Sequence, residues 1–130
     1  MLDSNLVIPY LADDPATVPL VERLAPRGIA ISIITYLEVY QGTLRSPNPH
    51  LALEQFEHFL AVVPTLPLSP AVARRCARLR ESLKGRGRRV RHRALDLVIA
   101  ATALEHGLQL VTRNLADYED IPELALHTPS

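Results

Sequence analysis

Four acidic residues, far apart in the sequence, fall where they could hold a divalent cation together: Asp3, Glu38, Asp96 and Asp117. Two of them follow short apolar stretches that read as strands, and the other two lie in the first turns of expected helices. Because strand C-termini and helix N-termini share one edge of an α/β layer, we expect the four carboxylates to converge there. Clustered carboxylates repel one another and stay ionised together only with cations between them. Oxygen-only ligation suits Mg²⁺ or Mn²⁺, so the pattern predicts a site for one of these ions.

Each acid also has an explanation that needs no cation. Asp3 could cap the first helix, and Asp96 could interact favourably with the dipole of its own helix. Thr35-x-x-Glu38 matches a capping box, in which the glutamate reaches back to a backbone N–H. Asp117 belongs to a run of polar residues that could form a solvated turn. The common placement at one edge favours the metal site over four separate coincidences.

The segments that must position these acids alternate between short apolar strands and helices. Strands are expected near residues 1–3, 29–34, 62–68, 108–111 and 124–126, and helices near 6–11, 17–24, 35–43, 53–63, 70–83 and 95–106. Ser69-Pro70 is a helix start, with a capping side chain followed by proline. Gly107 can end the last helix in a left-handed conformation. The alternation predicts an α/β fold with a mainly parallel sheet.

The charges are distributed unevenly although the formal net charge is zero. Ten of the fourteen Lys and Arg residues lie between Arg74 and Arg93, and Glu81 is the only acid among them. The densest part is a basic loop interrupted by Gly85 and Gly87, with six basic residues on or beside it: Lys84, Arg86, Arg88, Arg89, Arg91 and Arg93. These side chains either contact a polyanion such as RNA, contact an acidic partner, or form a solvated hairpin.

Several classes of protein are disfavoured. The single cysteine, Cys76, can form neither an internal disulfide nor a zinc site, which favours a reducing cytoplasm. No signal peptide or membrane-spanning run is present, and no Gly-x-Gly-x-x-Gly or Walker pattern occurs. The five histidines are scattered, so none is expected to activate Ser4 or Thr112 as a nucleophile.

Three segments resemble the motifs of PIN-domain nucleases, and most closely those of VapC-type toxins of bacterial toxin–antitoxin pairs: residues 2–5 (LDSN), 34–42 (ITYLEVYQG) and 96–117. The resemblance covers nearly the whole chain and implies one PIN-like domain over residues 1–130, folded as an α/β/α sandwich. It also implies a metal-dependent endoribonuclease that forms a homodimer and is neutralised by a VapB-type antitoxin. In such an enzyme the metal lowers the pKa of a bound water and neutralises charge on the phosphate.

The resemblance assigns roles to individual residues. Asp3, Glu38 and Asp96 match the metal-binding acids, and the supporting polar positions are Ser4, Asn5, Thr112 and Asn114. Asn114 stands where many PIN domains have a fourth acid, which leaves Asp117 as the charged candidate and Asn114 as a neutral ligand or orienting group.

Two points stay open at this stage. The first strand is very short, so either the central strand is stunted or the natural start lies upstream of Met1. A PIN-like module that binds RNA or an acidic partner without catalysis is the main alternative, and a nuclease acting on DNA is another.

Overall fold

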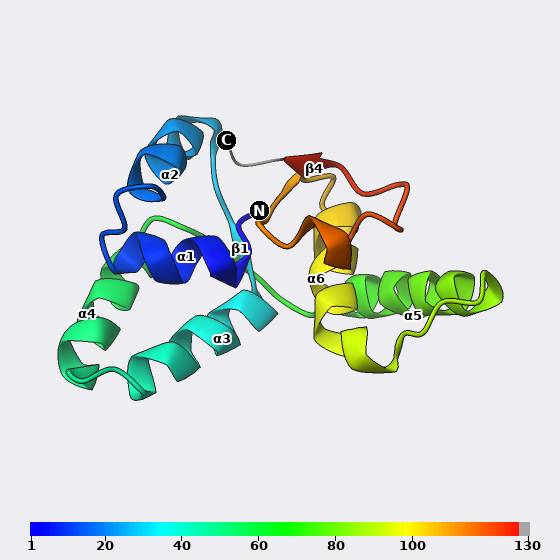
Figure 1. Ribbon diagram of the computed structural model, residues 1–130, viewed down its shortest axis with the longest axis horizontal. Coiled ribbons are helices and arrows are strands. Elements are labelled where there is room, and N and C mark those ends of the chain that lie inside the picture. Colours follow the sequence, from blue (N-terminus) through cyan, green and yellow to red (C-terminus); the bar gives the residue numbers. More distant parts are fainter. Residues whose placement is uncertain (128–130) are drawn as a thin grey trace.

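The computed structural model describes residues 1–127, and its strands are short and parallel (Figure 1). β1 (Ile31–Ser32) pairs with β2 (Thr65–Leu66), and β3 (Leu110–Val111) pairs with β4 (Leu126–His127). The expected parallel pairing is therefore confirmed, although each strand is only two residues long.

The N-terminal segment joins the two strand pairs. The backbone N–H of Leu2 donates to the carbonyl of Ala30 at 2.9 Å, and that of Asp3 donates to the carbonyl of Val111 at 3.0 Å. Leu2 also forms a parallel bridge with Val111. Residues 1–3 therefore lie between β1 and β3, in the middle of the sheet, and the chain leaves the sheet at Asp3.

Helices make up most of the described chain. The α-helices are α1 (Ser4–Leu11), α2 (Val18–Leu24), α3 (Ile33–Leu44), α4 (Pro49–Leu60), α5 (Pro70–Gly85) and α6 (Ala94–Glu105). The short 3₁₀ helices are η1 (Ala25–Arg27), η2 (Arg91–Arg93) and η3 (Leu115–Asp117). Within residues 1–127, none of these helices is both long enough and apolar enough to span a bilayer.

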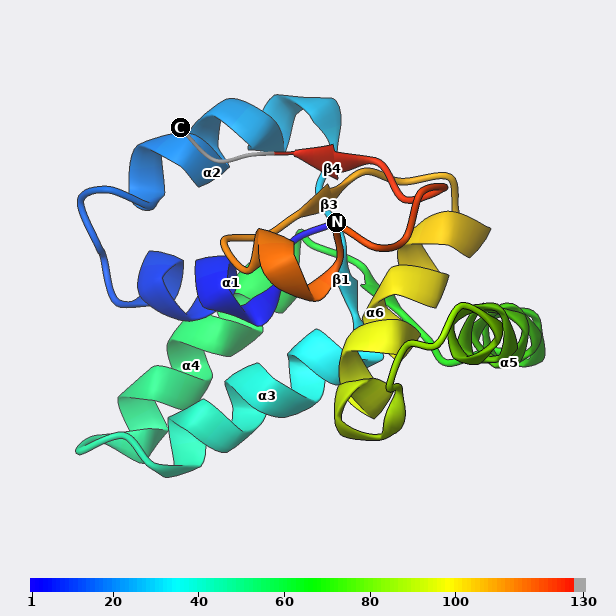
Figure 2. The same cartoon turned by 45° about the vertical axis from the view of Figure 1, so that its right-hand side comes forward.

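Neighbouring side chains of the central strands point to opposite faces of the sheet, as strand geometry requires. Met1 and Leu110 pack with residues of α5 and α6, whereas Leu2 and Val111 pack with residues of α1, α2 and α4. Figure 2 shows these two groups of helices on opposite sides of the strands. The expected α/β/α sandwich is therefore confirmed.

The start of α3 differs from the sequence-based expectation. The β-branched run 29–34 predicts a strand that ends at Ile34, but the strand ends at Ser32 and the helix begins at Ile33. Ser32 is extended, and its hydroxyl accepts a hydrogen bond from the backbone N–H of Thr35 at 3.1 Å, so Ser32 is the N-cap. Glu38 consequently lies in the second turn of α3, and the capping-box interpretation of Glu38 is wrong.

The basic loop is also shorter than the expected range 85–91. Gly85 is still the last residue of α5, and residues 91–93 form η2. The turn between them depends on Gly87, whose φ of 78° lies in the left-handed region that glycine adopts readily. The chain therefore returns quickly from α5 to α6, and η2 leads directly into the helix that carries Asp96.

Candidate active site

Asp3 sits at the junction between the central strand and α1. Its side chain is buried, with 5% of the residue exposed. Oδ1 accepts from the backbone N–H of Ser4 at 2.8 Å, and Oδ2 accepts from the hydroxyl of Thr112 at 2.8 Å. The carboxylate thus caps α1, as the capping explanation holds, and at the same time is fixed from the opposite strand. The two interpretations of Asp3 are compatible.

Thr112 connects most of the expected supporting residues. Its hydroxyl, fully buried, accepts from Asn5 Nδ2 at 3.1 Å and from the backbone N–H of Asn114 at 3.1 Å. Asn5 Oδ1 in turn accepts from the backbone N–H of Arg113 at 3.3 Å. The structure therefore brings Asn5, Thr112 and Asn114 together behind Asp3, with Asn114 contributing its backbone N–H to this network.

Glu38 faces the same region from α3. Burial raises the pKa of this half-buried carboxyl, and the nearby charges of Asp3 and Asp96 raise it further. A hydrogen bond from the Ser4 side chain acts in the opposite direction on the pKa. Ser4, a predicted supporting residue, is the first residue of α1, and its side chain reaches Glu38 of α3.

Asp96 occupies the first turn of α6, as expected. Burial is the largest cause that raises its pKa, and the charges of Asp117 and Asp3 add to it. The hydroxyl of Tyr118 and the charge of Arg93 lower the pKa but do not outweigh these effects. The folded state therefore disfavours the ionised form of Asp96, which is the condition that a bound cation would relieve.

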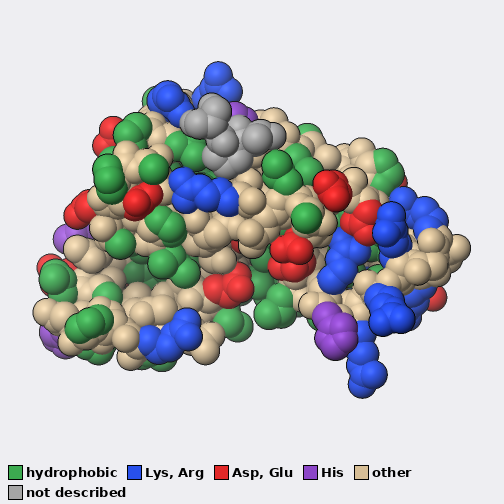
Figure 3. Space-filling view, viewed as in Figure 1, with side chains coloured by type: hydrophobic (Ala, Val, Ile, Leu, Met, Phe, Trp, Pro, Cys, Tyr) green, Lys and Arg blue, Asp and Glu red, His purple; other side chains and the backbone are tan. Residues whose placement is uncertain are grey.

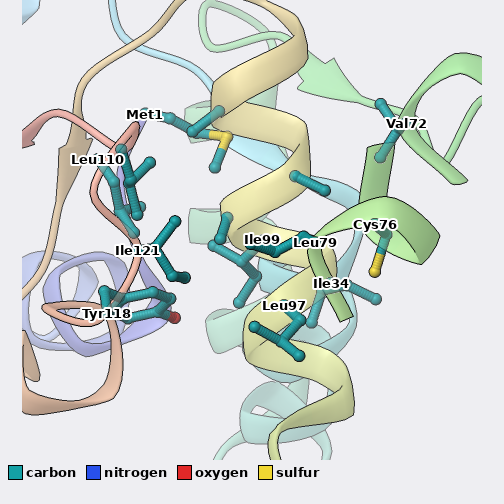
Figure 4. Packing of buried hydrophobic residues seen from close by; sticks show 14 of the residues in the cluster. Met1, Ile34, Val72, Cys76, Leu79, Leu97, Ile99, Leu110, Tyr118 and Ile121 are labelled. Atoms are coloured by element: carbon teal, nitrogen blue, oxygen red, sulfur yellow. The ribbon is translucent and has the colours of Figure 1, made fainter. Parts of the chain in front are cut away.

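Tyr118 is a site residue that the sequence did not reveal. Its hydroxyl lies 3.4 Å from Asp96 Oδ1 and 3.5 Å from Asp3 Oδ2, and the residue is 1% exposed. Figure 4 shows its ring beside Ile121, with the oxygen turned toward α6. Burial, and then the surrounding acids, strongly raise the pKa of the hydroxyl, so it remains a donor. The alternative interpretation of residues 117–120 as a solvated turn holds for the exposed Asp117 and Glu119 but is wrong for Tyr118, which is a core residue.

The fourth acidic position remains a prediction. Asp117 ends η3 and is exposed, and its charge contributes to the raised pKa of Asp96. The side chain of Asn114 is also exposed. Of the two candidates, Asp117 is the one whose side chain acts electrostatically on another acid of the site.

The donor chemistry of the four acids suits a hard divalent cation, since all their ligating atoms are oxygens. Within residues 1–127, none of the four forms an ion pair with a Lys or Arg side chain. In the same range, no three His, Cys, Asp or Glu side chains are placed to hold one metal ion as they stand. The acids therefore share a region without forming a closed ligand set.

The basic residues divide into paired and free groups. Lys84 Nζ lies 3.1 Å from Glu81, Arg88 Nε lies 3.9 Å from Asp120, and Arg93 is held by Asp120 at 2.7 Å. Of the six basic residues on or beside the loop, the other three have exposed side chains that form no ion pair within residues 1–127: Arg86, Arg89 and Arg91. Figure 3 shows Lys and Arg side chains gathered over α5 and the segment after it, next to acidic side chains on the same face.

The described chain is a short parallel sheet covered by helices on both faces, with the acids on elements that meet at its carboxyl edge. The family model described as PIN domain matches residues 1–123, and the chain belongs to this family.

Comparisons with individual proteins place the chain in the VapC branch of that family. It is 31% identical over 121 residues to the tRNA(fMet)-specific endonuclease VapC of Shigella flexneri, covering 93% of this chain and 90% of that protein. The crystal structure of DNA-bound VapBC from Salmonella typhimurium matches with a TM-score of 0.85 at 29% identity, over 98% of this chain and 95% of that one. A toxin–antitoxin complex from Klebsiella pneumoniae matches with a TM-score of 0.77 at 28% identity, over 99% and 96% of the two chains.

Proposed function

We propose that this protein is a divalent-metal-dependent endoribonuclease toxin of the VapC type. Asp3, Glu38 and Asp96 would hold Mg²⁺ or Mn²⁺, with Asp117 as the fourth acidic ligand. The observation that carries the proposal is electrostatic: the pKa values of Glu38 and Asp96 are raised by burial and by neighbouring acids, with no ion-paired Lys or Arg on these acids in residues 1–127. Membership of a family whose curated members are ribonucleases supports the choice of reaction.

The protein side chains have separable roles in this reaction. Asp3 is held rigidly by Thr112 and the N-terminus of α1, so it provides a fixed ligand. Glu38 and Asp96 enter from two different helices, so the ligand set would draw on three separate elements of the fold. When bound, the metal would supply an activated water and neutralise charge on the phosphate.

The substrate class follows from the surface beside the acids. A carboxylate cluster by itself repels RNA, so RNA needs a cationic approach. The exposed side chains of Arg86, Arg89 and Arg91 offer one on the segment that leads into Asp96. We assign phosphate contacts to these three residues, and a secondary contribution to Lys84 and Arg88, which are already near acids.

The proposed partners are a second copy of the chain and an antitoxin. One face of α3 exposes Ile33, Leu37, Tyr40 and Leu44, which line a shallow apolar depression. A second groove lies between α1, α3 and α4, beside Ile8 and Gly42. Solved relatives are complexes named VapBC and a toxin–antitoxin complex, and this supports antitoxin binding here. A basic antitoxin side chain near the acids would exclude metal and RNA together.

The test is cleavage of end-labelled RNA by the purified protein with Mg²⁺ or Mn²⁺, with and without chelator. We expect cleavage only with metal, and loss of cleavage in Asp96→Asn. Asparagine removes the charge that the folded state disfavours, so Asp96→Asn in chelator should melt no lower than the wild-type protein. RNA binding without cleavage under all metal conditions would favour the non-catalytic module, and cleavage confined to DNA would favour a DNA nuclease.

A further inference from the structure

Arg93 is predicted from sequence to contact RNA or a partner, but its side chain is turned inward. Nη1 donates to Asp120 Oδ2 at 2.7 Å, and Nη2 donates to Asp120 Oδ1 at 2.7 Å. Nη2 also donates to the backbone carbonyl of Asp117 at 2.8 Å. The side chain of Arg93 is 20% exposed and that of Asp120 is 15% exposed. A bidentate pair of this geometry is among the stronger and more directional contacts available to arginine.

The two ends of this contact carry the acids of the site. Arg93 is the N-cap residue of α6, three residues before Asp96. Asp120 and the Asp117 carbonyl belong to the segment that contains Asp117 and Tyr118. The guanidinium therefore links the helix start that holds Asp96 to the loop that holds the other acid and the buried tyrosine.

The loop does not depend on Arg93 for its local fold. The backbone N–H groups of Asp117 and Tyr118 donate to the carbonyls of Asn114 and Leu115. Tyr118 and Ile121, 1% and 2% exposed, anchor the loop in the core. Removing the Arg93 side chain should therefore leave the loop folded but less tightly placed against α6.

We propose that Arg93 and Asp120 form a positioning pair that sets the distance between Asp96 and Asp117 and thereby the affinity of the acidic site for its cation. The inference rests on the proposed metal-dependent function. Arg93 acts through the loop rather than by touching substrate, so it leaves the group of RNA-contacting residues. Its positive charge also faces Asp96 and Asp117, which tempers the repulsion between these acids when no cation is bound.

The experiment measures Mn²⁺ binding by titration calorimetry, without RNA, on the full chain. Arg93→Lys keeps the charge and removes the bidentate geometry, and Asp120→Asn keeps the shape and removes the charge. Each should weaken Mn²⁺ binding about tenfold, the lower end of what losing a group that orients a ligand costs. The double variant should bind no more weakly than the weaker-binding single variant, because both changes break the same pair.

Arg75→Lys is the matched control. Arg75 also forms an ion pair, through a single hydrogen bond from Nε to Glu105 Oε2 at 2.8 Å, between α5 and α6 and outside the acidic site. We expect Arg75→Lys to lower the melting temperature without changing Mn²⁺ affinity. If Arg93→Lys and Asp120→Asn destabilise the fold, binding is measured well below their melting temperatures, where the folded fraction is complete.

The outcomes separate the possibilities. Mn²⁺ affinity in Arg93→Lys equal to that in Arg75→Lys would overturn the positioning role while leaving the proposed function intact. RNA binding in chelator that falls in Arg93→Lys but not in Asp120→Asn would return Arg93 to the RNA-contacting residues and overturn the inference. A wild-type protein that binds no Mn²⁺ and cleaves no RNA would overturn the proposed function, and the inference with it.

Discussion

The hydroxyl of Thr112 donates a 2.8 Å hydrogen bond to Asp3 Oδ2 across 109 residues of sequence, and both residues are buried. This hydrogen bond joins the end of β3 to the N-terminus of α1. It fixes one acid of the site before any cation binds.

Replacing Thr112 with valine keeps the shape and removes the hydroxyl. The buried Asp3 oxygen loses its closer donor and the Asn5 amide loses its acceptor, so we expect about 1–3 kcal/mol of destabilisation. Thr112→Ser keeps the hydroxyl and should retain most of the stability and the cleavage. Urea unfolding of both variants measures the difference, and equal stability of the two variants would contradict the role of the hydroxyl.

Glu38→Gln separates metal binding from helix capping. Ser32 caps α3 and Glu38 lies one turn further on, so glutamine removes no cap. The raised pKa of Glu38 means that the ionised carboxylate is disfavoured in the folded state. Glu38→Gln should therefore melt no lower than the wild-type protein in chelator. Metal-dependent cleavage should be lost. Glu54→Gln on the exposed face of α4 is the control, and a similar activity in both variants would count against Glu38 as a ligand.

Tyr118→Phe removes a donor from two carboxylates while the ring stays packed. The hydroxyl distances of 3.4 and 3.5 Å are long for O–H···O bonds, so the loss of stability should stay below about 1 kcal/mol. We expect the larger effect on the metal concentration that gives half-maximal cleavage, because the hydroxyl helps to orient Asp3 and Asp96. Tyr10→Phe, whose ring packs on Phe59, serves as control. Identical metal dependence in the two variants would remove Tyr118 from the site.

The exposed arginines should govern the salt dependence of RNA binding. Replacing Arg86, Arg89 and Arg91 with alanine should weaken binding in chelator and flatten the log–log salt slope by about 0.7 for each phosphate that is no longer neutralised. Mn²⁺ affinity should stay unchanged, since none of the three forms an ion pair with the acids of the site in the described part of the chain. Retained RNA affinity together with reduced antitoxin affinity would assign this surface to the partner.

The ion pair of Asp120 predicts a pH dependence of stability. Hydrogen bonding from Arg93 is the largest cause that lowers the pKa of Asp120, and the charges of Arg93 and Arg88 lower it further. A depressed pKa in the folded state means that the stabilisation is present above the unfolded pKa and is lost as the pH falls through the folded one. Asp120→Asn should therefore melt below wild type near neutral pH, and the two curves should approach each other below about pH 4. A constant difference at all pH values would contradict this assignment.

Much of the fold follows from local patterns. The capped start at Ser69 and the glycine stop at Gly107 act within a few residues, and the sequence predicts both correctly. The start of α3 is predicted wrongly, because the β-branched residues Ile33 and Ile34 favour a strand whereas the Ser32 cap begins a helix. The sequence alone does not show which of the two preferences wins, because the length of β1 depends on its pairing with β2.

The site divides in the same way. The acids and Thr112 are recognisable from residue type and motif resemblance. Tyr118 and the inward turn of Arg93 are not, because both depend on how the segment after β3 folds back onto α6. From sequence alone, a tyrosine beside acids and an arginine in a basic run are both predicted to be surface residues. Only the packing of the segment after β3 against α6 shows that they are not.

The central position of residues 1–3 in the sheet has a consequence for synthesis. Leu2 cannot pair with Val111 of β3 until β3 has been synthesised. Asp3 likewise gains the hydrogen bond from Thr112 only after 109 further residues have been made. Pairings between such distant parts of a chain form late and slowly, since a long loop has to close first. A ribosome translating this protein would therefore carry a nascent chain without an assembled acidic site until Thr112 and the residues around it had emerged. The topology itself would delay the moment at which a nuclease of this kind becomes dangerous to the cell that makes it.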